Sequence, residues 1–561
     1  MHHTTLQLLL VAVVALPLVG ALAALLPAPP GLKGKSPDQA VLRHGVTVTG
    51  AVLAAAIALA VGFDHDDPAR MQATTDISWI PALHIRIHLG VDGISLPLVV
   101  MTALLTFLCA LYSYFHPPVA HRHPSQEALR AARHHGGPSP KAFVALLLVL
   151  EAGTLATFAV LDLMLFFLAF EMVLIPMYFL IARWGGAGRQ AAAWKFILYT
   201  LLGSVVMLLG LLLIGVKTGT FDMVALATDN GPQAQLSHTV QLLAVLAIGI
   251  GLAVKSPLWP LHSWLPDAHT AAPTVGSVLL AGVLLKMGTY GFVRIALPIT
   301  PEGMHTIAPY LAALAAVGII YGSLACLALV RKGARGDLKR LIAYSSVGHM
   351  GFVLLGIASA TPTGVNGALF ANIAHGLITG LLFFLVGALK DRTGTTDLDA
   401  LAGSTGAALY GKAPRFGGLL AFAAVASLGL PGLAGFWGEM LAMFGAFQPA
   451  AGLSRPAFWT FMVLAGLGTL LTAAYLLLVV RRVCMGGTPH LAPTAPLGAD
   501  GDPDPDAPEA PVTAPALPDL ARYEYAAWGP LAALTVLAGL WPAALLGLTD
   551  PAVQQLLGGG K

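Results

Sequence analysis

Fourteen apolar runs, each of about 18 to 28 residues, recur along the chain and constrain its fold more than any other feature. A helix needs about 20 apolar residues to cross the hydrocarbon core of a bilayer. Inside lipid only helices and closed barrels satisfy every backbone polar group, and runs of this length suit helices. The chain is 57% hydrophobic and 10% charged. We therefore expect an all-α polytopic membrane protein with about 14 transmembrane helices.

The runs fall into groups along the chain. Three N-terminal helices are expected within 1–115, one group of five within 142–297, a second group of five within 306–481, and a last helix at 524–548. The segment 485–523 is rich in proline and aspartate and is predicted to be disordered. The expected spans lie near 5–27, 44–63, 90–115, 142–159, 161–183, 189–216, 239–259, 274–297, 306–331, 338–359, 364–389, 416–447, 457–481 and 524–548.

The distribution of basic residues tests this span count independently. If the N-terminus lies outside, the connections on the cytoplasmic side hold 21 of the 30 lysines and arginines. Six lie in the opposite segments or termini, Arg294 among them, and three fall inside spans. Cytoplasmic loops carry the excess of Lys and Arg, so we expect both termini on the outer side.

Several other classes of site are disfavoured by the sequence. The three cysteines are scattered without a CxxC pair, and no phosphate-binding glycine motif occurs between a strand and a helix. The net charge of +3 favours no nucleic-acid partner. The histidine-rich connection at 116–135 is read as a solvated basic loop in preference to a metal site. The run near 5–27 resembles a signal peptide, but its length and its lack of a basic start favour a retained first span.

Two of the spans are interrupted in the same manner. Lys255-Ser256-Pro257 breaks one, and Leu428-Gly429-Leu430-Pro431-Gly432 breaks another shortly before Glu439. Each is the fourth span in its group of five, the seventh and twelfth overall. Paired broken helices at matching places indicate a repeated transporter fold. Because each group has an odd number of spans, the two five-helix repeats are predicted to be inverted.

Ionisable residues inside the apolar spans are the candidate functional residues. Such groups are costly in lipid and usually mark an ion or proton path, although they can also serve as static ion pairs that join helices. Lysine and carboxylate groups carry protons when burial and neighbouring charges shift their pKa, and histidine titrates near neutrality. The candidates are Glu151, Glu171, Lys195, Lys255, Lys286, His349, His375 and Glu439.

The candidates differ in how they would be stabilised. Glu171 lies in the middle of a span, and Lys255, at a helix break, is the expected partner that would relieve its burial. Pairing would hold Lys255 charged, and separation would release its proton. Lys195 lies near the cytoplasmic end of its span, from which its side chain could reach the interface. Glu439 follows the second break, where a carboxylate could meet water.

Five motifs together resemble the antiporter-like membrane subunits of respiratory complex I. The resemblance covers roughly 90–480, and a glutamate in place of lysine on the twelfth helix is more similar to the M type than to the L or N types. The motifs are Phe170-Glu171-Met172, Pro176-Met177-Tyr178-Phe179-Leu180-Ile181, Trp264-Leu265-Pro266-Asp267-Ala268-His269, Asp337-Leu338-Lys339-Arg340-Leu341-Ile342-Ala343-Tyr344-Ser345-Ser346 and Gly429-Leu430-Pro431-Gly432.

The resemblance implies a fourteen-helix proton channel with broken seventh and twelfth helices. It implies an essential carboxylate–lysine pair, matching Glu171 and Lys255, and a relay to the terminal carboxylate, matching Lys286, His349, His375 and Glu439. It implies a translocase in the bacterial inner membrane, in which other subunits hold FMN, iron–sulfur clusters, NADH and quinone. The implied partners are other membrane subunits, especially the two antiporter-like chains L and N, and the lipid bilayer.

Three other functions remain open from the sequence. The chain could be a subunit of a multisubunit Na+/H+ antiporter or of a membrane-bound hydrogenase, since both are related transporters. A function of a different class is a structural membrane subunit without conduction, in which the buried charges only join helices.

Overall fold

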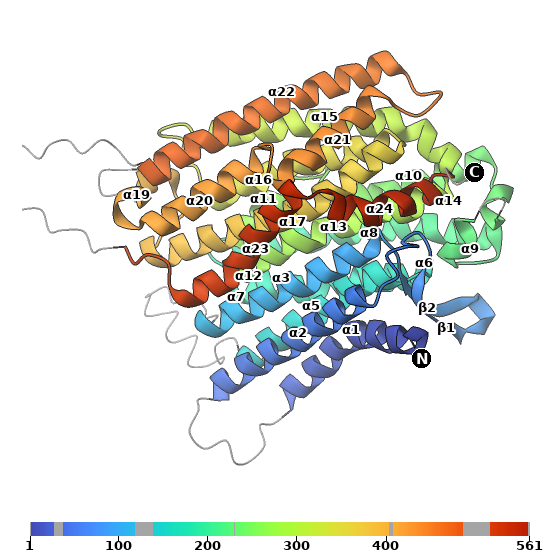
Figure 1. The fold of residues 1–561 in the computed structure, drawn as a ribbon, viewed down its shortest axis with the longest axis horizontal. Helices are drawn as coiled ribbons and strands as arrows, with labels where there is room; N and C mark the ends of the chain where they lie inside the picture. Colours follow the sequence, from blue (N-terminus) through green and yellow to red (C-terminus); the bar gives the residue numbers. More distant parts are fainter. Residues whose placement is uncertain are drawn as a thin grey trace, which may run out of the picture.

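The computed structural model describes residues 2–26, 37–117, 139–228, 231–402, 408–485 and 517–558. It is a bundle of long helices whose axes follow its longest dimension (Figure 1). Most of the histidine-rich connection at 116–135 and of the proline-rich segment at 485–523 lies outside the described residues.

The described residues contain twelve helices that are long and apolar enough to cross a membrane. A thirteenth is added if α23 (Arg522–Leu540) and α24 (Ala543–Leu556), bent by 68° at their junction, count as one span. The span predicted at 416–447 consists of two shorter helices, α20 (Pro414–Ser427) and α21 (Ala434–Phe447). The all-α membrane class is confirmed, and the count of fourteen stays a prediction.

The remaining long helices follow the predicted runs closely, and short helices lie between the runs. The first part of the chain contains α1 (His2–Leu25), α2 (Pro37–Val61), α3 (Ser95–Phe115), α5 (Pro140–Ala159), α6 (Leu163–Met172), α7 (Leu174–Trp184), α8 (Arg189–Thr218), α9 (Met223–Leu226) and α10 (His238–Lys255). The second part contains α11 (Trp264–Ala271), α12 (Thr274–Leu279), α13 (Leu285–Gly291), α14 (Leu297–Ile299), α15 (Pro301–Leu329), α16 (Leu338–Ala358), α17 (Pro362–Thr393), α18 (Leu398–Ala402), α19 (Leu409–Lys412) and α22 (Arg455–Val480).

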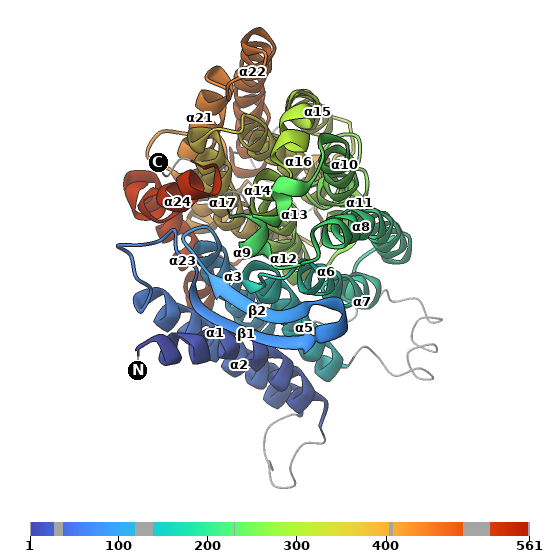
Figure 2. The ribbon, with the colours of Figure 1, turned by 90° about the vertical axis from the view of Figure 1, so that its right-hand side faces the viewer.

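The sequence analysis does not anticipate a β-hairpin between α2 and α3. Its strands are β1 (Gln72–Ile80) and β2 (Ile85–Val91), paired antiparallel. Its residues alternate between polar and β-branched or aromatic types, a pattern that favours strands but is too short to stand out beside the apolar runs. The hairpin covers one end of the bundle, here named the hairpin end (Figure 2).

One turn occurs twice in the chain with equivalent hydrogen bonds. It reads Thr218-Gly219-Thr220-Phe221-Asp222 after α8 and Thr393-Gly394-Thr395-Thr396-Asp397 after α17. In each copy the glycine ends the helix with a left-handed φ, 72° and 76°, which glycine adopts without a Cβ clash. In each copy the aspartate caps the following short helix and forms a β-bridge to an aspartate that begins an earlier helix, Asp162 or Asp337.

These two turns lie at opposite ends of the bundle. The first leads into α9 at the hairpin end, and the second leads through α18 toward α19 at the other end (Figure 1). Each follows the third helix of its predicted group of five. An inverted repeat produces this arrangement, because the second group enters the membrane from the opposite side. The paired turns therefore support the predicted inversion of the two groups.

The most buried helices lie at the centre of the bundle. The helical stretch Thr274–Ile299, which contains α12, α13 and α14, is buried except at the half-buried Thr274 and Pro298, and most of α17 is buried as well. The stretch includes two π-helical turns, Leu280–Leu284 and Phe292–Ala296, which often mark functional sites inside helices. By contrast, α1, α8 and α22 expose apolar side chains on the outside of the bundle. The buried ionisable residues are thus concentrated on inner helices.

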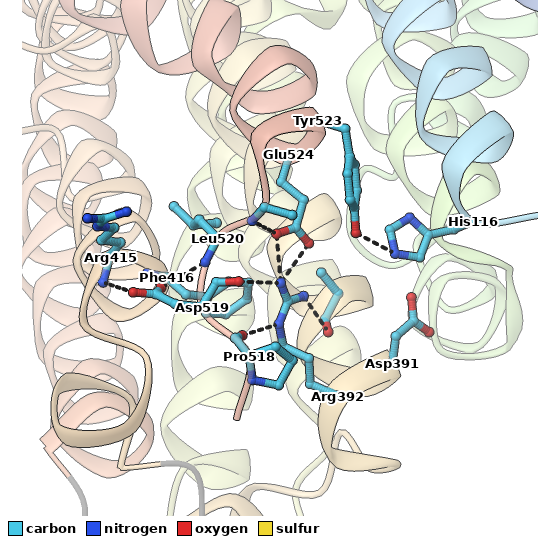
Figure 3. A network of polar contacts seen from close by, with 12 residues as sticks. His116, Asp391, Arg392, Arg415, Phe416, Pro518, Asp519, Leu520, Tyr523 and Glu524 are labelled. Carbon is cyan, nitrogen blue, oxygen red and sulfur yellow. Dashed lines mark hydrogen bonds and ion pairs between the residues drawn. The ribbon is translucent and has the colours of Figure 1, made fainter. Parts of the chain in front are cut away.

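A polar network anchors the last membrane helix (Figure 3). The Arg392 guanidinium at the end of α17 forms an ion pair with Glu524 at 2.7 Å, and it also donates to the backbone carbonyls of Pro518 and Asp519. The Asp519 carboxylate accepts from the backbone N–H of Phe416 at the start of α20. Residues 517–523 are thus tied to the bundle, whereas the sequence predicts disorder through 523.

Candidate functional site

The helix break after Lys255 has a clear local cause. Pro257 and Pro260 cannot donate backbone hydrogen bonds, so α10 ends at Lys255 and the chain resumes as α11 at Trp264. The Trp264 indole N–H donates to the backbone carbonyl of Val254 at 3.0 Å. This bond satisfies a carbonyl that the break would leave open, and it holds the break in place beside the ammonium group of Lys255.

The ammonium group of Lys255 is buried without a hydrogen-bond partner among the described residues. The side chain is 1% exposed, and Nζ lies over the ring of Phe170, 4.6 Å from the ring centroid. Glu171, the next residue of α6, interacts electrostatically with Lys255. No ion pair within 4.0 Å joins the two, so the expected Glu171–Lys255 contact is not formed in this structure. The Phe170 ring, in place of the expected Glu171 carboxylate, contacts the Lys255 ammonium.

The ammonium group of Lys286, in contrast, has two close partners. Nζ donates to the backbone carbonyl of Ala281 at 2.6 Å and lies 2.6 Å from Nδ1 of His375 on α17. Ala281 belongs to the π-helical turn just before Lys286, and that turn leaves carbonyls free for side chains. The lysine is 0% exposed and His375 is 5% exposed. Lys286 thus joins the helix after the break to α17.

The two histidines form the next part of the site. The rings of His375 and His349 lie edge to face with centroids 5.6 Å apart. On the far side, His349 Nδ1 lies 3.1 Å from a carboxylate oxygen of Glu439, and its Nε2 lies 3.0 Å from the hydroxyl of Ser427. Lys286, His375, His349 and Glu439 therefore form one line of neighbouring side chains across α13, α17, α16 and α21.

The second helix break positions Glu439. Gly429 and Gly432, between α20 and α21, have φ values of 74° and 92°, which glycine adopts without strain. A Cβ on Gly429 would lie 3.0 Å from a carboxylate oxygen of Glu439, so the close approach also requires glycine. Thr469 of α22 donates to the same carboxylate at 3.2 Å. Glu439 is 6% exposed, which places the carboxylate inside the bundle.

A small cavity adjoins the two histidines and Glu439. Ser427, His349, His375 and Glu439 are among the side chains that line it. The space open to the centre of a water-sized sphere is about 20 Å³, and about 10 to 15 Å³ suffices for one water molecule. The cavity has the polar partners that a buried water needs. Nε2 of His375 has no hydrogen-bond partner among the described residues, whereas both ring nitrogens of His349 are bonded, so a water there would connect His375 to His349 through the Ser427 hydroxyl.

Lys195 and Glu151 lie apart from this line. The Lys195 ammonium is 2.7 Å from Asp267, whose other oxygen binds Arg340 at 3.0 Å. Lys195 is therefore part of a half-buried ion triad at the end of the bundle away from the hairpin. Glu151 on α5 is 1% exposed, and neither of its carboxyl oxygens has a hydrogen-bond partner among the described residues. The structure joins neither of them to Lys286 by a direct contact.

Two residues of the quoted motifs belong to the site although sequence reasoning did not select them. His269 is 0% exposed, stacks on Phe383 with centroids 4.5 Å apart, and interacts electrostatically with both Lys286 and Lys339. Lys339 is 2% exposed and donates to the backbone carbonyl of Ala272. The signal was their place inside the long motifs, but their positions near span ends suggested exposed connections.

Arg294 is a third residue that sequence reasoning placed wrongly. It was counted with the charges outside the membrane, yet it is buried in the helical stretch Thr274–Ile299 and forms an ion pair with Asp92 at 2.6 Å. The available signal was its place inside the run predicted at 274–297.

No group of three or more histidine, cysteine, aspartate or glutamate side chains suited to a metal ion occurs within the described ranges.

Comparisons with known proteins agree with the motifs. Residues 160–472 match the family described as NADH:quinone oxidoreductase/Mrp antiporter, TM. The chain is 38% identical over 532 residues to NADH-quinone oxidoreductase subunit M of Rhodobacter capsulatus, with 93% of this chain and 92% of that protein covered. It is 37% identical over 423 residues to NADH-ubiquinone oxidoreductase chain 4 of Marchantia polymorpha, with 75% and 77% covered.

Solved structures give the same result for the fold. A chain of respiratory complex I from Thermus thermophilus matches with a TM-score of 0.76 and 29% identity, over 98% of this chain and 100% of that chain. A chain of the Mrp complex from Dietzia sp. DQ12-45-1b also has a TM-score of 0.76, at 21% identity, over 98% of this chain and 52% of that chain, and shows the fold alone. The chain therefore belongs to the membrane-subunit family shared by NADH:quinone oxidoreductases and Mrp antiporters.

Proposed function

We propose that the chain translocates protons as a membrane subunit of an NADH:quinone oxidoreductase. The single observation that carries the proposal is the line of contacts from Lys286 through His375 and His349 to Glu439. Each member can hold or release a proton, and all four lie inside a bundle of membrane helices. Relatives that match nearly the whole chain are named as subunits of this oxidoreductase. As a subunit of that enzyme, the chain couples electron transfer from NADH to quinone to proton pumping.

The line of contacts suggests how a proton moves. A charged Lys286 donates to Nδ1 of His375, so the proton has an acceptor 2.6 Å away. The step from His375 to His349 uses one bridging water, for which the adjoining cavity has room, and the Ser427 hydroxyl that is bonded to His349 Nε2. His349 then passes a proton to the Glu439 carboxylate at 3.1 Å. Proton transfer of this kind requires donors and acceptors within about 3.2 Å or one water apart.

The input side depends on Lys255. Its partnerless ammonium, close to Glu171 but not bonded to it, is costly in a buried site. Approach of Glu171 would stabilise the charged lysine, and withdrawal would drive the proton toward Lys286. Gly288, two residues after Lys286, packs so closely on Ser256 that a Cβ would lie 2.3 Å from the serine hydroxyl. The two lysines thus sit on tightly joined helices.

The finer assignments rest on charge and on the family. The hairpin end and both termini are proposed to face outside a bacterial inner membrane, because the basic connections gather at the other end. The proposed neighbours are the antiporter-like chains L and N. We assign no redox group to this chain, and FMN, iron–sulfur clusters, NADH and quinone would be held by other subunits.

A Lys286→Met variant of the assembled complex tests the proposal. Methionine keeps the length and apolar packing but cannot carry a proton, so we expect NADH-driven proton uptake into vesicles to fall by about a hundredfold, within the range of a positioned proton-transfer group. The matched control is Lys217→Met, at an exposed lysine near the end of α8. Assembly is checked by the content of the other subunits. Full pumping in an assembled Lys286→Met complex would refute the channel.

A sodium series separates this function from Na+/H+ antiport. For the proposed function, proton uptake depends on NADH and is unchanged when sodium is replaced by choline. An uptake that requires sodium and proceeds without NADH would favour the antiporter instead.

A further inference from the structure

A second polar network occupies the hairpin end of the helix that carries Lys286. Tyr290 and Arg294 follow Lys286 at intervals of four residues, which places them on the same side of a helix, one and two turns away. Arg294 is 6% exposed and Tyr290 is 0% exposed. A continuous polar stripe therefore leads from Lys286 toward the outer face of the bundle.

The contacts of Arg294 hold it in one place. Its guanidinium donates to both carboxylate oxygens of Asp92, at 2.6 and 2.7 Å, and to the hydroxyl of Tyr290 at 3.2 Å. Asp92 also accepts backbone N–H bonds from Ile94 and Ser95 at the start of α3. The Tyr290 hydroxyl donates to the backbone carbonyl of Phe158. The network of Asp92, Tyr290 and Arg294 thus joins the start of α3, the end of α5 and the helix of Lys286.

A cavity lies immediately outside the pair. It has a volume of about 670 Å³ and opens at the hairpin end between α9, α24 and the segment before β1. Asp92 and Arg294 are among its lining residues, together with the more exposed Asp67 and Arg70. Tyr290 is not part of the lining, so the ion pair forms the boundary between the cavity and the helix interior. A cavity of this size admits water to the pair, only two helical turns from Lys286.

We propose that the Asp92–Arg294 pair is a proton barrier that separates the outer cavity from Lys286. A guanidinium stays charged at every physiological pH and passes no proton on, and it binds both oxygens of the Asp92 carboxylate, so neither group of the pair is open to a proton from the cavity. With this direct route closed, a proton on Lys286 leaves sideways, through His375. The inference rests on the proposed function, and it assigns to Arg294 and Asp92 a role in directing the proton, not in carrying it.

Passive proton permeability of the assembled complex tests the barrier. The complex is reconstituted in liposomes with a trapped pH-sensitive dye, without NADH, and an external pH step is applied while valinomycin and potassium clamp the voltage. For Arg294→Met we expect the imposed pH difference to decay about tenfold faster. This corresponds to a decrease of about 1.4 kcal/mol in the activation free energy of proton permeation. Arg294→Gln, which keeps hydrogen-bond donors but loses the charge, is the second variant should the first not assemble.

Two double variants separate the barrier from damage to packing. Asp92→Asn with Arg294→Met removes the carboxylate as well, and the asparagine oxygen still accepts from the backbone N–H groups of Ile94 and Ser95, so we expect the low proton permeability of the parent. Lys286→Met with Arg294→Met removes the proton acceptor two turns inside, so we expect the leak to disappear. Arg294→Lys keeps a cation, so its passive proton permeability should stay as low as that of the parent.

Each outcome bears on one claim. The barrier is overturned if the pH difference decays as slowly in both Arg294→Met and Arg294→Gln as in the parent. It is also overturned if Asp92→Asn with Arg294→Met leaks protons as fast as Arg294→Met alone. It is also overturned if Lys286→Met leaves the leak unchanged, because the leak would then follow another route. Failure of the proposed function shows separately, as full NADH-driven pumping by Lys286→Met with Arg294 intact.

Discussion

The two broken helices share a scaffold but hold their ionisable groups in opposite conditions. Lys255, at the first break, lies over the Phe170 ring with no hydrogen-bond partner among the described residues. Glu439, near the second break, is bonded to His349 and Thr469. The Thr-Gly-Thr-x-Asp turns of the two groups, meanwhile, have matching hydrogen bonds. The repeat therefore preserves the backbone and differs in its buried charges.

This difference indicates a division of labour. A buried charge without a partner is costly. A small movement of Glu171 toward or away from Lys255 therefore strongly changes the stability of the protonated lysine. A charge bonded on both sides is stable in place and suits relay of a proton that arrives from elsewhere. We infer that coupling to the redox subunits acts at the first break, and that the second conducts.

Loss of either charged group at the first break should have the largest effect. In Lys255→Met and Glu171→Gln the assembled complex should lose most of its NADH-driven proton pumping, because the lysine is absent or its charge is no longer controlled. Proton uptake per NADH oxidised in inverted vesicles measures this, with Lys217→Met as control. Near-parental pumping in either assembled variant would show that the charges at the first break only join helices. It would refute the proposed functional difference between the two breaks.

Glu439→Gln should have the next largest effect. The amide keeps the size and can still bond His349 and Thr469, but it cannot accept the proton, so we expect turnover to fall about tenfold or more. Glu302→Gln, at the exposed start of α15, is the matched control. A Glu439→Gln complex indistinguishable from its parent would remove Glu439 from the relay and would leave the second break without an assigned acceptor.

His349→Ala should cost less than either change. Removal of the ring enlarges the adjoining cavity, and ordered water can then connect His375 to Glu439. We expect a several-fold loss of pumping, compared with exposed His65→Ala as control. Complete inactivity with intact assembly would show that water cannot replace the ring, and the second break would then be as sensitive as the first.

Phe170→Leu should have the smallest effect, and it probes the first break without altering a charge. The ring stabilises the Lys255 ammonium by about 1 kcal/mol, a typical cation–π contribution, so its loss should change the pumping rate several-fold at most. Phe166→Leu, one turn earlier on α6, controls for the lost ring volume. If the two variants behave alike, the aromatic contact does not tune Lys255.

The positions of the helix breaks and of most buried charges were predictable from local chemistry. Pro257 follows Lys255 directly, and Gly429, Pro431 and Gly432 interrupt the run before Glu439, so both breaks were visible in the sequence. The partners of these charges were not. Lys195 binds Asp267, and Lys286 binds His375, 89 positions further along the chain. Contacts between distant helices depend on how the helices rotate and pack, which apolar runs do not encode.

By itself, the sequence determined that this chain is a bundle of membrane helices, because backbone polar groups in lipid must be satisfied internally and apolar runs of this length suit helices. It also determined which spans carry ionisable groups and where two of them break. Only the tertiary structure decided which groups touch. Packing placed a ring under Lys255, aligned Lys286 with two histidines and Glu439, and buried Arg294 against Asp92. Those choices depend on side-chain distances of a few ångströms between helices, and such distances decide whether a buried charge is held or released.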